Sequence, residues 1–194
     1  MTQRERFRGF RRRPADRRVE AELSIISERR AAPSPDGRGG RTPLIRPLGP
    51  DDVGTVADLA ARCSDETLRR RFHAPVAHLS LDRVAQMLTA SDAVGVVVAE
   101  FDAAIVAVAT LHRDVRGEGE MAVIVEDSWQ STGLGSRLTA ALFDVARDCG
   151  VPVIVADVLR EPRFLMDQLR RHNPDATVTV DGPVATIRMP VLAA

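Results

Sequence analysis

Residues 123–138 read Val-Ile-Val-Glu-Asp-Ser-Trp-Gln-Ser-Thr-Gly-Leu-Gly-Ser-Arg-Leu, and this stretch decides the fold. It starts as a β-branched strand, passes through a loop, and continues as a helix whose apolar periodicity ends at Gly150. Gly133 and Gly135 allow the loop a positive φ and a close approach of backbone to a ligand. Because the first turn of a helix has unpaired N–H groups, the stretch predicts a pocket for a phosphate or pyrophosphate.

The loop is therefore the first candidate binding site. Its candidate residues are Gln130, Ser131, Thr132, Gly133, Leu134, Gly135 and Ser136. No Gly-Lys-Ser/Thr follows, so the loop is not the P-loop of nucleotide hydrolases. A dinucleotide fingerprint would need three glycines at the first strand–helix junction of a parallel sheet, and the strands before this loop do not form one.

Three β-branched strands precede the helix. They cover residues 93–99, 104–111 and 120–125, and the pair Asp102-Ala103 predicts a tight hairpin between the first two. Short links between neighbouring strands predict an antiparallel meander. The strand expected at 151–156 is continuously apolar and follows the long helix, so we expect it to be central and buried.

Further elements flank this unit at both ends of the chain. Before the meander, a first strand is expected at 43–48, and helices are expected to begin at Asp51-Asp52, at Ser64 as an N-cap and at Ser80. After the strand at 151–156, another helix is expected to cover Phe164, Leu165 and Leu169. The last two strands are expected at 176–180 and 184–189, on either side of the turn Asp181-Gly182. The order predicts an α/β fold with a mixed, mostly antiparallel central sheet flanked by helices.

The loop and the element order together resemble the GNAT N-acetyltransferases. Members of that family hold the pyrophosphate of acetyl-CoA in a Gln/Arg-x-x-Gly-x-Gly/Ala loop between an antiparallel strand and a long helix, which residues 130–135 match. The resemblance covers residues 43–191. It implies acetyl-CoA as the acyl-donor substrate and an amine as the acceptor.

Shorter segments resemble the bacterial protein lysine acetyltransferase branch of this family. Residues 64–72 resemble its Ser-x-Glu-Ser-x-x-x-Arg-Phe segment, residues 120–125 its Ala-Glu-x-Ala-x-x-Val strand, and residues 158–161 its Leu-x-Glu-Asn segment. The resemblance implies that the acceptor is a protein lysine or a small amine.

The resemblance also implies a mechanism in which the amine attacks the thioester directly. The backbone of Val123, Ile124 and Val125 would bind the pantetheine arm, with an amide near Val123 polarising the thioester carbonyl, and Gln130 to Ser136 would hold the pyrophosphate. Glu120 matches the general base of the family, and we expect partial burial to raise its pKa. Glu100 is the alternative base.

Two departures from the family pattern leave a second hypothesis open. Many GNAT enzymes use a tyrosine as the acid for the leaving thiolate, and this chain contains no tyrosine. Pro162 replaces the asparagine of the related segment. His112 and His172 are the alternative proton donors. A non-catalytic acyl-CoA-binding regulatory module is therefore the alternative to an acetyltransferase.

Charge divides the chain into two parts. We expect residues 1–41 to be a disordered, arginine-rich arm and residues 42–194 to be the GNAT domain. The arm holds 12 arginines and 6 acidic residues, and the domain holds 15 arginines and 21 acidic residues. The arm's charge suits contact with nucleic acid, but the acidic domain argues against a large basic interface, so we expect no nucleic-acid partner.

The remaining composition sets the expected environment. The two cysteines, Cys63 and Cys149, do not form a disulfide framework, and the four scattered histidines do not suggest a metal site. The N-terminus lacks the apolar segment of a secretory signal, and no apolar run is long enough to span a membrane. We therefore expect a cytoplasmic protein without metal or membrane contact, and a monomer or homodimer.

Overall fold

The computed structural model describes residues 41–73, 80–161, 166, 167, 169, 171 and 173–191. Its elements are β1 (Leu44–Pro47), α3 (Asp52–Arg62), α4 (Asp65–Phe72), α5 (Leu81–Leu88), β2 (Ala93–Phe101), β3 (Ala104–Arg113), β4 (Gly119–Val125), the 3₁₀ turn η2 (Asp127–Trp129), α6 (Leu134–Asp148), β5 (Val153–Leu159), β6 (Thr177–Asp181) and β7 (Val184–Pro190). None of the helices in these ranges has both the length and the apolarity to span a bilayer. The expected arm lies outside the described residues, apart from Arg41.

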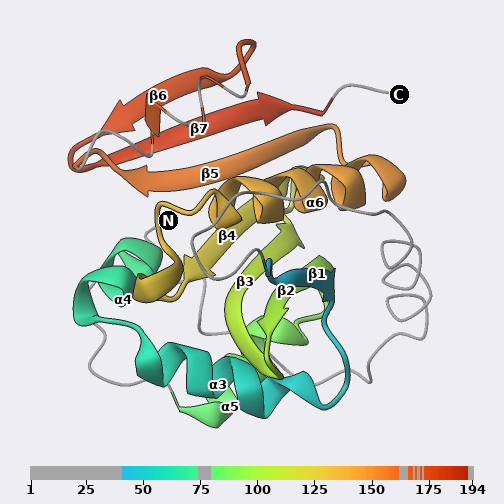
Figure 1. Ribbon diagram of the computed structural model, residues 1–194. Helices are drawn as coiled ribbons and strands as arrows, with labels where there is room; N and C mark the ends of the chain where they lie inside the picture. The colour runs from blue at the N-terminus through green and yellow to red at the C-terminus, as the bar shows by residue number, and fades with distance from the viewer. Residues whose placement is uncertain are drawn as a thin grey trace.

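One mixed sheet organises the described residues. Its strand order is β1-β2-β3-β4-β5-β7-β6, and every neighbouring pair is antiparallel except β4 with β5. The strands β4 and β5 run parallel because α6 carries the chain back across one face of the sheet between them (Figure 1). The predicted fold class and the predicted meander of three strands are confirmed.

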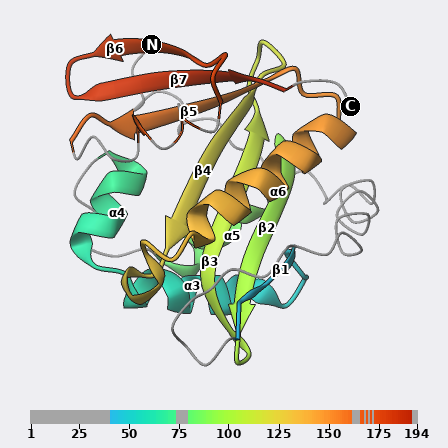
Figure 2. The same ribbon diagram turned by 45° about the horizontal axis from the view of Figure 1, so that its top comes forward.

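The pairing of β4 with β5 is short. Gly119 pairs with Ile154 and Glu120 with Val155, and no further β4–β5 pair forms in the described chain. Beyond Glu120 the two strands diverge, as Figure 2 shows. From Met121 onward, the backbone groups of β4 that face β5 therefore have no partner on that strand.

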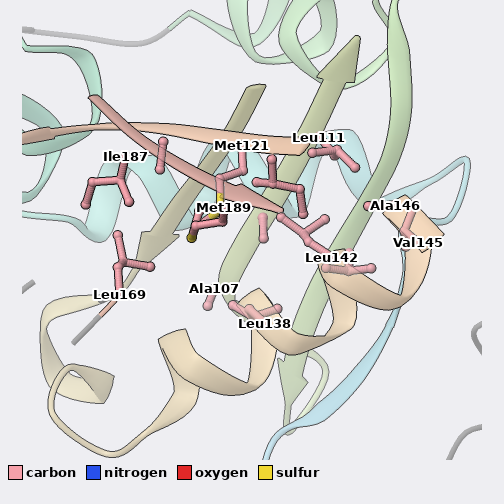
Figure 3. Packing of buried hydrophobic residues seen from close by; sticks show 14 of the residues in the cluster. Ala107, Leu111, Met121, Leu138, Leu142, Val145, Ala146, Leu169, Ile187 and Met189 are labelled. Carbon is pink, nitrogen blue, oxygen red and sulfur yellow. The ribbon is translucent and has the colours of Figure 1, made fainter. Parts of the chain in front are cut away.

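Helices cover both faces of the sheet and enclose two apolar layers. On one face, α6 packs over β2, β3 and β4 (Figure 2), and Gly95 permits this because a Cβ there would lie 2.6 Å from Val145 Cγ1. Figure 3 shows Leu138 and Leu142 of α6 inside this layer. On the other face, α3 and α5 bury Leu59 and other apolar residues against β2, β3 and β4.

Local sequence signals placed several element boundaries correctly. Ser64 caps α4, with its hydroxyl accepting a hydrogen bond from the N–H of Thr67 at 3.2 Å. Both residues of the β2–β3 turn, Asp102 and Ala103, have a positive φ, as a tight hairpin with two central residues requires. Gly150 takes a φ of +65° directly after α6.

The helix expected to begin at Asp51-Asp52 does so: Asp51 is the N-cap residue of α3 without a side-chain hydrogen bond, and Asp52 accepts hydrogen bonds from the N–H of Gly49 and from Arg46. Two other expectations differ from the structure. The strand β5 is central but begins at Val153, and only the alternate residues Ile154, Ala156 and Val158, which belong to the α6 layer, are buried. Phe164 and Leu165, expected in a helix, lie outside the described residues.

Candidate functional site

The loop between β4 and α6 is held on a buried aromatic residue. Trp129, at the end of η2, is 2% exposed and packs against Phe101 with ring centroids 4.8 Å apart. The Thr132 hydroxyl donates a hydrogen bond to the Trp129 carbonyl at 2.7 Å. Ser131 and Gly133 both have a positive φ, +62° and +84°, so the backbone turns sharply twice before the helix begins.

These turns leave a row of backbone N–H groups unpaired. The N–H of Gln130 donates to the Asp127 carbonyl, and the N–H of Arg137 donates to the Gly133 carbonyl. Of the six N–H groups between them, the five from Ser131 to Gly135 have no assigned acceptor within the described part of the chain. The start of α6 adds the positive end of a 15-residue helix dipole. At the predicted loop, the backbone therefore presents N–H groups of the kind that can bind an anion.

Gly135 keeps the first turn of α6 open. A Cβ at this position would meet only Val125 Cγ2, at 3.9 Å, which is an ordinary contact. Packing within the protein therefore does not require glycine here. The open space lies beside the unpaired N–H groups, where a pyrophosphate would approach the backbone.

Two predicted loop residues stabilise the loop through the hydrogen bonds and packing of their side chains. The Gln130 side chain donates to the Thr67 hydroxyl at 2.8 Å and to the Val125 carbonyl at 3.1 Å. Leu134 is 2% exposed and packs in the layer under α6. These side chains fix the shape of the loop. Ser136, partly buried in the first turn of α6, completes the predicted set.

Asp127 connects the loop to α4, and sequence reasoning missed it. Its carboxylate accepts hydrogen bonds from the Ser64 N–H at 2.8 Å, the Ser64 hydroxyl at 2.6 Å and the Thr67 hydroxyl at 3.0 Å. Burial raises the pKa of Asp127, but these hydrogen bonds outweigh it, so the pKa lies below its ordinary value. An acidic residue after a strand gave no signal that its partners would be 60 or more positions earlier in the chain.

The three predicted β4 residues lie along the free edge of that strand. Val123 and Val125 pair with Ala109 and Ala107 of β3, and their partly buried side chains face the α6 layer. Ile124 is 5% exposed and faces the α3–α5 layer. Their side chains serve the core, so the backbone of this edge is what they offer to a ligand.

Glu120 occupies the last paired position before β4 and β5 diverge. It lies opposite His112 on β3 and Val155 on β5. Its side chain is exposed, so the partial burial expected from the sequence is not found. The carboxylate is therefore accessible at the point where the strands separate.

The charge of Glu120 acts on two residues at the end of α4, Arg71 and His73. Burial lowers the pKa of Arg71 to about 10, with the Glu120 charge acting in the opposite direction, so Arg71 stays cationic at neutral pH. Burial also lowers the pKa of His73, against the charges of Asp157 and Glu120. The influence of Glu120 on Arg71 and His73 was not predicted, because nothing in the local pattern relates the end of α4 to β4.

The alternative base does not share this site. Glu100 lies on β2, and its carboxylate binds Arg46 Nε at 2.7 Å. Its partner on β3 is Ile105, whereas the partner of Glu120 is His112, at the other end of the same strand. Of the alternative proton donors, His112 is adjacent to Glu120, whereas His172, like Pro162, is outside the described residues.

The candidate site also lacks a metal-binding arrangement. No group of three or more His, Cys, Asp or Glu side chains in the described ranges is placed to hold an ion.

Comparison with known protein families decides the class of this site. The model of the acetyltransferase (GNAT) family matches residues 63–163, just over half of the chain. The chain belongs to the GNAT acetyltransferase family. It is accordingly an acyltransferase by family, and the matched range includes Glu120, the free edge of β4 and the loop before α6.

Solved structures agree with this fold. The GNAT domain of PAT from S. lividans aligns with a TM-score of 0.70 at 24% identity, covering 79% of this chain and 93% of that chain. The structure of yncA from Salmonella typhimurium with its cofactor acetyl-CoA gives 0.58 at 20% identity, covering 79% and 96%. The PaiA N-acetyltransferase from Thermoplasma acidophilum in complex with coenzyme A gives 0.60 at 12%, covering 77% and 99%. The search of curated proteins gave no significant match.

Proposed function

We propose that this GNAT protein transfers an acetyl group from acetyl-CoA to a primary amine, either a protein lysine or a small amine. The observation that carries the proposal is the row of unpaired N–H groups from Ser131 to Gly135 beside the open edge of β4. Two similar structures, those of yncA and PaiA, were solved with acetyl-CoA and coenzyme A.

The loop and the strand edge suit different parts of acetyl-CoA. The five N–H groups and the helix dipole stabilise the negative pyrophosphate without needing basic side chains. The backbone of Val123 and the N–H of Val125 can bond the amide groups of the pantetheine arm as another strand would, whereas the Val125 carbonyl already accepts from Gln130. An N–H near Val123 would polarise the thioester carbonyl, where negative charge develops during attack.

Glu120 is the proposed general base. Its accessible carboxylate, at the end of the β4–β5 pairing, would take a proton from the acceptor ammonium directly or through a water molecule. The free amine then attacks the thioester carbon without a covalent protein intermediate. The protein lysine branch is favoured by the segments at 64–72, 120–125 and 158–161, and the GNAT domain of PAT has the same fold.

The test is thiol release from acetyl-CoA across a panel of amines and lysine peptides. We expect turnover by the wild type and a decrease in kcat of about 10²-fold or more for Glu120→Gln, with unchanged acetyl-CoA affinity, because only proton transfer is removed. The matched control is Glu100→Gln, which should retain wild-type kcat.

Two outcomes would contradict this proposal. If the folded wild type binds acetyl-CoA but acetylates nothing in the panel, the non-catalytic acyl-CoA-binding module replaces the acetyltransferase. If Glu120→Gln turns over as fast as the wild type, the protein is a transferase but Glu120 is not its base.

A further inference from the structure

A small cavity lies on the face of the sheet that α3 and α5 cover. Eleven residues from α3, α4, α5, β3 and β4 line it, and nine of them are apolar. The two exceptions are Thr110 of β3 and Arg71 of α4. Its volume of about 10 Å³ suits the end of one small polar group and not an acyl chain or a peptide. An apolar cavity with a few convergent polar groups is the usual form of a small-molecule site.

The hydroxyl of Thr110 is buried at this cavity without a partner. Thr110 is 4% exposed, and its Oγ1 makes no hydrogen bond within the described part of the chain. A buried hydroxyl without a hydrogen bond destabilises a fold, whereas a valine of similar shape does not carry that cost. A hydroxyl at this position is therefore explained by an occupant that hydrogen-bonds to it.

Arg71 adds a positive charge to the lining. It lies on α4, which contacts both β4 and β5 (Figure 2). Its guanidinium carbon is 4.9 Å from the centroid of the Phe72 ring, and none of the ion pairs or hydrogen bonds in the described ranges includes this partly buried side chain. Its pKa of about 10 keeps it cationic at neutral pH. A planar guanidinium without a bound carboxylate is suited to the two oxygens of a carboxylate ligand.

The cavity and Glu120 share one face of the sheet. On β4, Ala122 and Ile124 line the cavity, and Glu120 is two residues before Ala122. Side chains two residues apart in a strand point to the same face and lie about 7 Å apart. Thr110 pairs with Ala122, directly before Val123, where the thioester carbonyl is proposed to bind. An acceptor whose amine approaches Glu120 can therefore place a second group at the cavity.

We propose that this cavity is an acceptor subsite, in which the Arg71 guanidinium and the Thr110 hydroxyl bind the carboxylate of a small amine that is also an acid. This inference rests on the proposed acetyltransferase function and names its acceptor class. Such an acceptor is a zwitterion at neutral pH. Its ammonium is attracted to Glu120 and its carboxylate to Arg71, so the two charges of the site set its orientation. A lysine side chain within a protein has no carboxylate beside its amine, so the cavity favours the small amine.

Two other occupants suit the lining less well. An acyl chain longer than acetyl would contact the apolar residues but would leave the Thr110 hydroxyl and the Arg71 guanidinium without hydrogen bonds. A structural water would satisfy Thr110 but would bring no negative charge to Arg71.

The experiment measures kcat/KM for pairs of amines that differ in one carboxylate. ω-Amino acids from glycine to 6-aminohexanoate are compared with n-alkylamines of the same carbon number, and α-amino acids are compared with their amides. We expect the wild type to prefer the carboxylate-bearing member of at least one pair by about tenfold or more, because the other member lacks a charge-assisted hydrogen bond. Lysine peptides in the same assay test the protein acceptor.

Two substitutions assign this preference to the cavity. Arg71→Gln and Thr110→Val should each raise KM for the carboxylate-bearing amine, while kcat/KM for its partner stays within about threefold of the wild type. The controls are Arg69→Gln, an exposed arginine on the same helix, and Thr179→Val, an exposed threonine on β6, and both should keep the wild-type preference. Because the preference is a ratio measured in one preparation, an unfolded fraction does not change it.

Thermal denaturation of Thr110→Val without acceptor separates ligand binding from a structural role. If the hydroxyl serves an acceptor, valine should leave the melting temperature unchanged or raise it, because no hydrogen bond within the protein is lost. A melting temperature below that of Thr179→Val, together with an unchanged preference, would mean that Thr110 holds a structural water and would overturn the subsite.

The remaining outcomes separate the subsite from the function on which it rests. If the wild type acetylates no amine and no peptide, both proposals fail. If it acetylates amines or lysine peptides but prefers the carboxylate in no pair, the acetyltransferase stands and the subsite is overturned. The same holds if Arg71→Gln keeps the wild-type preference.

Discussion

At the scale of single residues, the unusual backbone conformations at the site are concentrated in the loop before α6. Ser131 has a φ of +62°, a conformation that costs a residue with a Cβ about 1–2 kcal/mol. Gly133, two residues later, also has a positive φ, which glycine adopts without that cost. Such conformations persist where the surroundings over-determine them, and here Trp129 and Gln130 do so.

Asp127 is the residue on which the link between loop and α4 depends. We expect Asp127→Asn to destabilise the fold by about 1–2 kcal/mol, because it weakens three hydrogen bonds of a largely exposed group. Chemical denaturation at several pH values measures this. The folded pKa of Asp127 is depressed, so the contribution is present above the unfolded value of about 3.9 and is lost as pH falls through the folded pKa.

The control for this prediction is Asp58→Asn, an exposed change on α3. It should leave stability within about 0.5 kcal/mol of the wild type. If Asp127→Asn is no less stable than Asp58→Asn at pH 7, or if the difference between them persists at pH 3, the proposed role of Asp127 is wrong.

At the scale of elements, α6 has two functions: it supplies the N–H groups of the site and most of one apolar layer. Leu142 is fully buried in that layer, between α6 and the sheet (Figure 3). Because its removal leaves a cavity, Leu142→Ala should lower the free energy of unfolding by about 2–5 kcal/mol. Urea denaturation measures this against Leu81→Ala, whose leucine is 55% exposed on α5 and should cost far less.

An equal loss of stability in the two leucine variants would mean that α6 is not the core helix described here.

Element by element, the sequence was informative wherever the cause is local. The cap at Ser64, the β2–β3 turn and the stop at Gly150 depend on neighbouring residues, so their patterns predicted them. The exposure of Glu120 could not be predicted in this way. It depends on where β5 leaves β4, which no periodicity in either strand encodes.

At the scale of the whole molecule, the site is assembled by topology. The loop was predicted because glycine spacing and helix periodicity are adjacent in the chain. The hydrogen bonds of Ser64 and Thr67 with Asp127 join segments far apart in the sequence, so only the folded arrangement brings them together. The division into a 1–41 arm and a 42–194 domain stays a prediction.

The central claim is that the loop before α6 binds the pyrophosphate of acetyl-CoA, and Gly135→Ala tests it most directly. Alanine is better than glycine inside a helix by up to about 1 kcal/mol, and the new Cβ meets only Val125 at 3.9 Å. We therefore expect this variant to be at least as stable as the wild type. Its Cβ should nevertheless obstruct the ligand and weaken binding.

Calorimetric titration with acetyl-CoA, together with thermal denaturation, measures both effects. Gly54→Ala on α3 is the control, since a Cβ there meets nothing within 4 Å. We predict that Gly135→Ala binds acetyl-CoA at least about tenfold more weakly than the wild type and Gly54→Ala, without loss of stability. Unchanged affinity in a folded Gly135→Ala protein would contradict the assignment of the loop.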